Sequence, residues 1–243
     1  MTNFKIQIIS DSVCPWCYVG YRRLSRAISI HKTSNPSDTF TLNWRAFYLN
    51  PHSPPYPGRN KQEMYAEKFG EERCKAMFSR LAAAGESDGI KFKFGGNTGS
   101  TRDSHRVIWY AGEEEAKATA AAAENDSATT TTAAAAAAST AVGGLQTRVV
   151  ENLFRAYFEE EKNITDAEVL VEAAVRAGLD GGEVSKLLET GVGAEQVDAE
   201  AFAASRRLVS GVPHFTVQGK YLVEGADEPE TFLEVFERVK LDE

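Results

Sequence analysis

The sequence predicts an α/β protein in which a strand–helix–strand start and a strand–strand–helix end flank a large all-helical insertion. Alternation of apolar and polar residues, which is typical of strands, occurs near the two ends of the chain, whereas apolar residues between them recur at helical spacing. Neither end has enough strands to bury both of its faces alone. We therefore expect the two ends to combine into one mixed sheet of four strands.

The first three elements follow from the pattern near the N-terminus. Apolar residues alternate with polar ones over residues 4–10, which predicts a strand. Helical spacing follows over residues 15–31, and alternation returns over residues 39–50, so a helix and a second strand are expected. A strand–helix–strand unit joins its strands in parallel through a right-handed crossover.

A proline-rich stretch, PHSPPYPG, marks the end of this unit. We predict three segments: residues 1–55 as the N-terminal part of the sheet domain, residues 56–205 as a helical insertion domain, and residues 206–243 as the C-terminal part of the sheet domain. In the last segment, HFTVQGKYLVEGA predicts a hairpin that turns near Gly219. Pro229 is expected to begin the closing helix, because proline is favoured at the first helical position.

One part of the insertion, residues 118–144, consists largely of alanine and threonine and has almost no large apolar side chain. Its alanines favour a helix, whereas the threonine run and the closing glycines oppose one. We interpret this segment as a mobile insertion between two helices. The alternative is a solvent-exposed, alanine-rich extension of a helix, and neither interpretation suggests chemistry.

Composition and charge argue against several classes of function. The chain has 243 residues, a net charge of −8 and a pI of about 5.2, so we expect no basic surface for nucleic acid or an anionic membrane. It has no run of about 20 apolar residues that would span a membrane. The start, MTNFKIQIIS, does not resemble a secretory signal, and three cysteines do not make a structural disulfide framework. These features favour a cytoplasmic protein with reduced cysteines.

The stretch DSVCPWCYVG contains two cysteines, Cys14 and Cys17, with Pro15 and Trp16 between them. Because proline is favoured at the first position of a helix, Cys14 is the expected N-cap residue and Cys17 lies one turn further in. The Cys14 sulfur would face the free N–H groups and the positive end of the helix dipole, which favour a thiolate. Cys17 would be close enough to form a disulfide with it.

Such a pair fits three kinds of site: a redox couple, half of a metal site, or two core residues that lie close together. A zinc site needs further ligands at characteristic spacing. The other cysteine and the histidines are scattered along the chain: His31, His52, Cys74, His105 and His214. Two passive core cysteines would not explain the helix-start geometry. We therefore predict a dithiol–disulfide couple and no metal.

Four stretches of the chain resemble the DsbA-like branch of the thioredoxin superfamily, and within it the FrnE-like oxidoreductases. They are SDSVCPWCYVG, WRAFYLNP, STRDSHR and SGVPHFTVQGKYLVEGA. The resemblance runs from residue 4 to about residue 240 and leaves residues 118–144 unmatched. The same family includes 2-hydroxychromene-2-carboxylate isomerases and resembles kappa-class glutathione transferases.

This resemblance implies a thioredoxin fold with a helical domain inserted into it. It implies that Cys14 is the nucleophile, that Cys17 is the resolving thiol and that Pro213 is the cis-proline of the substrate-binding loop. Val212 and Trp16 are expected to bind substrate beside that proline.

Two further residues are candidates for a supporting role. Asp11 lies three positions before Cys14 and could assist proton transfer or could cap the helix. His105 matches the family pattern, and a hydrogen bond at the start of a helix is its simplest role.

We therefore predict a thiol–disulfide oxidoreductase that acts on disulfide-containing proteins or small-thiol disulfides. It needs no bound cofactor, because the cysteine sulfur is the redox centre, and glutathione is a candidate co-substrate. Two alternatives stay open. One is a glutathione-dependent isomerase or transferase, in which the thiol of bound glutathione reacts. The other is a non-catalytic, chaperone-like binder that uses the helical cleft.

Overall fold

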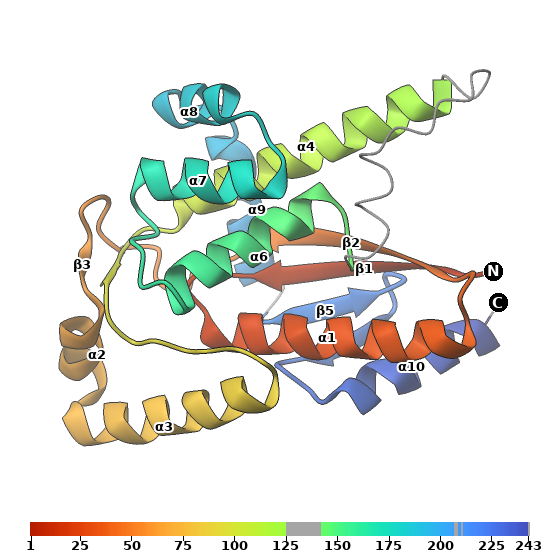
Figure 1. Ribbon diagram of the computed structural model, residues 1–243, viewed down its shortest axis with the longest axis horizontal. Helices are drawn as coiled ribbons and strands as arrows, with labels where there is room; N and C mark the ends of the chain where they lie inside the picture. Colours follow the sequence, from red (N-terminus) through yellow and green to blue (C-terminus); the bar gives the residue numbers. More distant parts are fainter. Residues whose placement is uncertain (125–141, 207–208, 210, 243) are drawn as a thin grey trace.

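The computed structural model describes residues 1–124, 142–206, 209 and 211–242. At its centre is a mixed sheet of four strands in the order β2-β1-β5-β6 (Figure 1). The strands are β1 (Asn3–Ser10), β2 (Thr39–Ala46), β5 (His214–Val217) and β6 (Tyr221–Glu224). β1 and β2 are parallel, whereas β5 pairs antiparallel with both β1 and β6. The prediction that the two ends of the chain form one sheet is confirmed.

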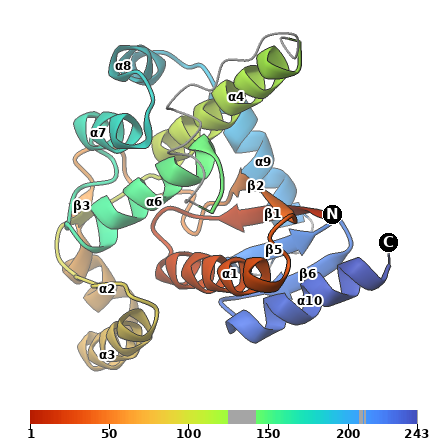
Figure 2. The ribbon, with the colours of Figure 1, turned by 45° about the vertical axis from the view of Figure 1, so that its right-hand side comes forward.

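Helices α1 (Pro15–Ser34) and α10 (Pro229–Leu241) lie side by side on one face of this sheet (Figure 2). The alternating apolar residues of β1 are buried, and the ring of Phe4 lies 5.0 Å from that of Phe236 on α10. On β5, Phe215 contacts Phe232 of the same helix at a ring distance of 5.0 Å. The apolar face that the sequence pattern gives to the strands is thus covered by two helices.

The insertion is mainly helical. Its helices are α2 (Lys61–Phe69), α3 (Glu71–Ser87), α4 (Arg102–Glu124), α6 (Leu145–Phe158), α7 (Ala167–Ala177), α8 (Gly181–Glu189) and α9 (Ala194–Arg206). Two short strands, β3 (Arg59–Asn60) and β4 (Asn97–Thr98), also pair within it. Strands of two residues have no periodicity, so the sequence did not predict them. Figure 1 shows α2 and α3 beyond the end of the sheet at which α1 begins.

Side chains from α6 and α9 cover the edge strand β2. The Trp44 N–H donates to Gln146 Oε1 at 2.9 Å, and the Trp44 indole donates to Thr147 Oγ1 at 3.0 Å. The Ala46 N–H donates to Glu200 Oε2 at 3.0 Å. The bonds from the Trp44 and Ala46 N–H groups satisfy backbone donors that an edge strand would otherwise offer to another chain.

The carboxylate of Asp38 is buried at the end of the sheet where β1 begins and α1 ends, and it connects three segments of the chain. Asp38 accepts hydrogen bonds from the Thr2 N–H at 2.9 Å and from Lys240 Nζ at 2.8 Å, and His31 Nε2 lies 2.9 Å from its Oδ2. Lys240 makes the largest contribution to holding the pKa of Asp38 well below its usual range, followed by Thr2 and His31. The N-terminus, α1 and α10 therefore all contact the carboxylate of Asp38.

The structure describes only the two ends of the Ala/Thr-rich segment. Residues 118–124 continue α4, as the helical alternative predicts, and residues 142–144 lead into α6. Residues 125–141 lie outside the described part of the chain, so the mobile insertion stays a prediction. Within the part that the structure describes, no helix is long and apolar enough to cross a membrane.

Candidate active site

Cys14 and Cys17 lie at the start of α1, directly after the first strand. Pro15 is the first residue of the helix, and Cys14 is its N-cap residue with an extended backbone (φ −89°, ψ 113°), as predicted. The loop before it is closed by a hydrogen bond from the Cys14 N–H to the Asp11 carbonyl at 3.0 Å. Both thiols are free and buried.

The surroundings of the Cys14 sulfur differ from those that the cap position predicts. Within the described residues, this sulfur makes no hydrogen bond to the N–H groups of the first helical turn. It donates instead to the backbone carbonyl of Val212 at 3.5 Å. One hydrogen-bond partner of the Cys14 sulfur therefore comes from the C-terminal part of the chain.

Cys17 is held as a neutral thiol. Burial raises its pKa well above the ordinary value, and a hydrogen bond to Cys14 and the charge of Cys14 raise it further. Hydrogen bonds to its sulfur from the Ser10 hydroxyl and the Asp11 N–H only partly oppose this effect. Burial therefore disfavours the thiolate form of Cys17 at neutral pH.

The loop that ends at β5 lies against the cysteine pair. The Val212–Pro213 peptide bond is cis, and the Pro213 carbonyl accepts from the Gly225 N–H at 2.9 Å. On α1, a Cβ atom at Gly20 would lie only 2.9 Å from Cγ of Pro213. The absence of a side chain at Gly20 lets the helix and this loop approach closely.

Trp16, between the two cysteines, connects the site to the insertion. Its side chain is half-buried, and the guanidinium carbon of Arg80 on α3 lies 5.4 Å from its ring centroid. A guanidinium over an aromatic face is an attractive contact. Trp16, which the sequence predicted to bind substrate, therefore also contacts α3 through Arg80.

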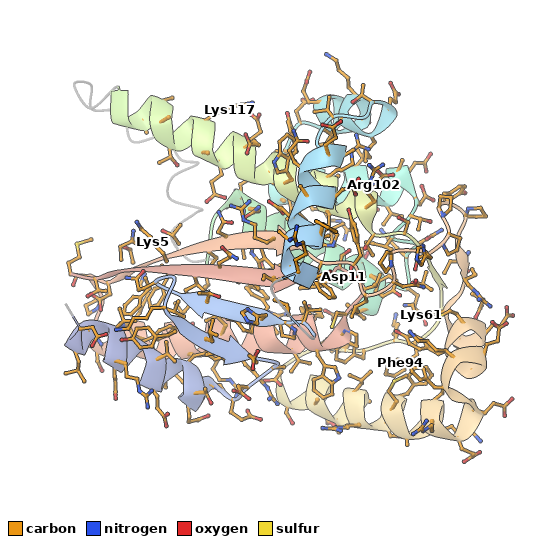
Figure 3. All side chains as sticks on the ribbon, turned by 180° about the vertical axis from the view of Figure 1, so that it is seen from behind. Lys5, Asp11, Lys61, Phe94, Arg102 and Lys117 are labelled. Carbon is orange, nitrogen blue, oxygen red and sulfur yellow. The ribbon has the colours of Figure 1, made fainter. Side chains whose placement is uncertain are left out.

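Asp11 and His105 are both buried, and they hold a neighbouring loop. Asp11 Oδ2 accepts from the Leu49 N–H at 2.8 Å, and Asp11 Oδ1 lies 3.5 Å from His105 Nε2. That nitrogen donates to the Phe47 carbonyl at 3.1 Å. Within residues 1–124, 142–206, 209 and 211–242, neither side chain makes a hydrogen bond to a cysteine sulfur, and their contacts support the loop after β2. Figure 3 shows Asp11 at the end of the sheet that faces Lys61 and Phe94.

A cavity of about 220 Å³ lies beside the cysteine loop. Asp11 and Val13 form one wall, and Tyr65 and Phe69 of α2 form another. Sequence reasoning did not select Tyr65, because on α2 it has the appearance of an ordinary apolar-face residue. Burial raises the pKa of Tyr65 to about 12, and the nearby Cys14 and Asp11 charges add to that shift.

Two further features lie behind this cavity. Tyr157, at its inner end, donates to Thr98 Oγ1 at 2.8 Å, and Lys61 Nζ lies 3.7 Å from the Tyr157 ring centroid. Burial lowers the pKa of Lys61 to about 8. Among the residues that the structure describes, no group of three or more His, Cys, Asp or Glu side chains is placed to hold a metal ion.

A cysteine pair at the start of the helix that follows the first strand of a four-stranded mixed sheet defines a thioredoxin-like protein. The family model of the DsbA-like thioredoxin domain matches residues 5–125 and 119–237. This chain belongs to that family, and the resemblance seen in the sequence is confirmed.

Two relatives match almost the whole chain. A crystal structure of a probable DsbA oxidoreductase from Streptomyces coelicolor is 26% identical, with a TM-score of 0.78 and coverage of 99% of this chain and 91% of that one. The uncharacterized protein YwbO from Bacillus subtilis (strain 168) is 24% identical over 230 residues, which are 93% of this chain and 92% of YwbO.

Two more distant structures share the fold alone. A 2-hydroxychromene-2-carboxylate isomerase is 15% identical, with a TM-score of 0.60 and coverage of 97% of this chain and 95% of its own. The cytosolic disulfide reductase DsbM from Pseudomonas aeruginosa, solved with GSH, is 17% identical, with a TM-score of 0.51. The match covers 98% of this chain and 100% of the DsbM chain. The chain therefore has a DsbA-like thiol oxidoreductase fold, with Cys14 and Cys17 close together.

Proposed function

We propose that this protein is a thiol–disulfide oxidoreductase whose redox couple is Cys14 and Cys17. The observation that carries the proposal is the placement of the pair: Cys14 is the N-cap residue of α1, and Cys17 is a buried thiol in its first turn whose pKa burial raises. A pair of thiols that differ in this way suits attack by one and resolution by the other.

The reaction proceeds in two exchanges. The Cys14 thiolate attacks one sulfur of a substrate disulfide, so that a Cys14–substrate bond forms and the other substrate sulfur leaves as a thiolate. Cys17 then loses its proton and attacks Cys14, which releases the second substrate thiolate and forms the Cys14–Cys17 disulfide. An external thiol reduces that disulfide and returns the protein to its dithiol form.

We propose Pro213, Val212 and Trp16 as the residues that receive the substrate. The contact of Cys14 with the Val212 carbonyl and the half-buried position of Trp16 support this assignment. Asp11 and His105 are proposed to hold the adjoining loop. The substrate class is a protein or small-thiol disulfide.

Glutathione is the small thiol that we propose as co-substrate, and the cytoplasm is the proposed location. The structural likeness to DsbM, a cytosolic disulfide reductase solved with GSH, supports both. The acidic net charge of −8 argues against nucleic acid as a partner. Equilibration of the protein with glutathione buffers measures its reduction potential and so gives the direction of the reaction.

The test uses Cys17→Ser, with Cys14→Ser as its matched control. Because Cys17 releases the mixed disulfide, Cys17→Ser should accumulate a stable Cys14-linked adduct with glutathione or a protein thiol, visible by mass spectrometry under non-reducing conditions. Its multiple-turnover reduction of insulin should fall far below that of the wild type. Cys14→Ser should form no adduct at all.

Other outcomes would identify the alternative functions. If Cys17→Ser turns over at close to the wild-type rate without an adduct, a glutathione-dependent isomerase or transferase replaces the proposal, because the reacting thiol then belongs to glutathione. If the wild type does not reduce insulin but prevents its aggregation, the protein is a chaperone-like binder.

A further inference from the structure

The cavity next to the cysteine loop has a wall made by a helix of the insertion. Val13, which directly precedes Cys14, lines this cavity of about 220 Å³ together with Tyr65 and Phe69 of α2. Its volume is smaller than the usual ligand pocket of roughly 300–1,000 Å³, so it suits a small group next to Val13, the residue before Cys14. A group that enters this cavity would contact Tyr65.

The ring of Tyr65 is held in place by aromatic neighbours. It stacks on Phe69 of the same helix at a centroid distance of 6.0 Å, and it meets Phe78 of α3 edge to face at 5.9 Å. Phe78 in turn stacks on Phe94 at 4.4 Å. This packing fixes the ring, and with it the position of the phenol oxygen.

The hydroxyl of Tyr65 has no hydrogen-bond partner among the described residues, although the ring is buried enough to raise its pKa to about 12. By contrast, the hydroxyl of Tyr157 in the same cavity is engaged with Thr98. A phenol with a raised pKa keeps its proton at neutral pH and is available as a donor. After burial, the charges of Cys14, Asp11 and Cys74 also raise the pKa of Tyr65.

We propose that the Tyr65 hydroxyl donates a hydrogen bond to the substrate sulfur that leaves when Cys14 attacks a disulfide. This inference rests on the proposed function. In the exchange, the bond between the two substrate sulfurs breaks while the bond to Cys14 forms, and the electron pair goes to the leaving sulfur. Tyr65 stabilises the charge that develops there but keeps its proton, and the thiolate takes its proton from water.

The test is Tyr65→Phe, which retains the ring contacts and removes only the hydroxyl. A hydrogen bond to a charged group contributes enough that its loss should lower the rate constant for attack on hydroxyethyl disulfide by about ten- to a hundredfold. The loss should be smaller with Ellman's reagent, because its leaving thiolate is less basic and needs less stabilisation. Alkylation of Cys14 by iodoacetamide, which releases iodide and no sulfur, should change little.

The matched control is Tyr56→Phe, at a tyrosine that is 62% exposed, and it should leave all three rates unchanged. Thermal unfolding checks that both variants fold. If Tyr65→Phe exchanges disulfides at the wild-type rate, or if alkylation falls by the same factor as exchange, the inference is wrong while the proposed function stands. If the wild type is alkylated normally but exchanges no disulfide, the proposed function fails and the inference fails with it.

Discussion

Asp38 is a single buried charge on which the N-terminus and the ends of α1 and α10 converge. Hydrogen bonds from Lys240, Thr2 and His31 favour its ionised form, so its pKa lies well below the usual value. A group whose pKa is lower in the folded state than in the unfolded state stabilises the fold above its unfolded pKa, which is about 3.9 for aspartate. That stabilisation is lost as the pH falls through the folded pKa.

Asp38→Asn should therefore lower the free energy of unfolding by about 3 kcal/mol at neutral pH, because several hydrogen bonds to a buried carboxylate are weakened. The difference from the wild type should be constant above about pH 5 and should shrink below about pH 4. Urea unfolding at a series of pH values measures it.

The control for this experiment is Asp242→Asn, at an exposed carboxylate that also pairs with a lysine, Lys220. Asp242→Asn should change the free energy of unfolding little at any pH, since exposed ion pairs contribute little to stability. An Asp38→Asn difference that stays unchanged down to pH 2 would show that the charge of Asp38 is not what stabilises this end of the sheet.

At the scale of elements, helix α1 begins at the cysteine pair and also packs against the loop that contains Pro213. The close approach occurs at Gly20, where an added Cβ would meet Pro213 Cγ at 2.9 Å and Phe215 Cζ at 3.2 Å. Neither the proline ring nor the buried phenylalanine is a flexible chain end, so the helix and the loop would have to separate.

Gly20→Ala tests this packing. Alanine is the better helix former by roughly 0.5–1 kcal/mol, but overpacking of a tight contact costs about 1–3 kcal/mol. We expect a net loss of about 1 kcal/mol in denaturant unfolding. We also expect slower disulfide exchange, because the Val212 carbonyl moves away from Cys14.

Gly182→Ala, near the start of α8, is the matched control, because among the described residues only Asp180 Oδ1, at 3.2 Å, comes close to an added Cβ atom. This exposed position should tolerate alanine, and its disulfide exchange should match that of the wild type. A stabilised and fully active Gly20→Ala would disprove the packing argument.

At the scale of the whole molecule, the net charge of −8 creates a negative field around a buried thiol pair. Cationic disulfides are then attracted to the protein and anionic ones are repelled. Salt weakens both effects, since the screening length falls to about 10 Å at 0.1 M ionic strength.

The field predicts how salt changes the exchange rate. From about 0.01 M to about 0.5 M salt, the rate constant should fall for cystamine, which is cationic, and rise for oxidised glutathione, which is anionic. Neutral hydroxyethyl disulfide is the control and should react at a nearly constant rate. Equal salt dependence for all three disulfides would mean that the net charge does not steer the substrate.

Much of the fold was predictable from local patterns. Alternation in β1 and β2, the proline at the start of α1 and the hairpin around Gly219 were each visible over a few residues, and the structure confirms them. The paired two-residue strands β3 and β4 were not visible, because they form only where the insertion folds back on itself.

The position of the cysteine pair at a helix start was predictable from the sequence, but the surroundings of the Cys14 sulfur were not. The spacing of Cys14, Pro15 and Cys17 predicted the N-cap position, and the structure places Cys14 there. The same reasoning predicted that the Cys14 sulfur would face the first helical turn, whereas it donates to the Val212 carbonyl. A cap geometry describes only one helix, and it carries no information on which distant loop packs against it.

The sequence by itself determined the order of the elements and the position of Cys14 and Cys17 at a helix start, because periodicity, proline at a helix start and cysteine spacing act between near neighbours in the chain. The tertiary structure alone decided that Tyr65 of the insertion lines a cavity with Val13, and that the Cys14 thiol donates to the Val212 carbonyl. These contacts join segments far apart in the sequence, and they depend on the packing of helices that local patterns do not specify.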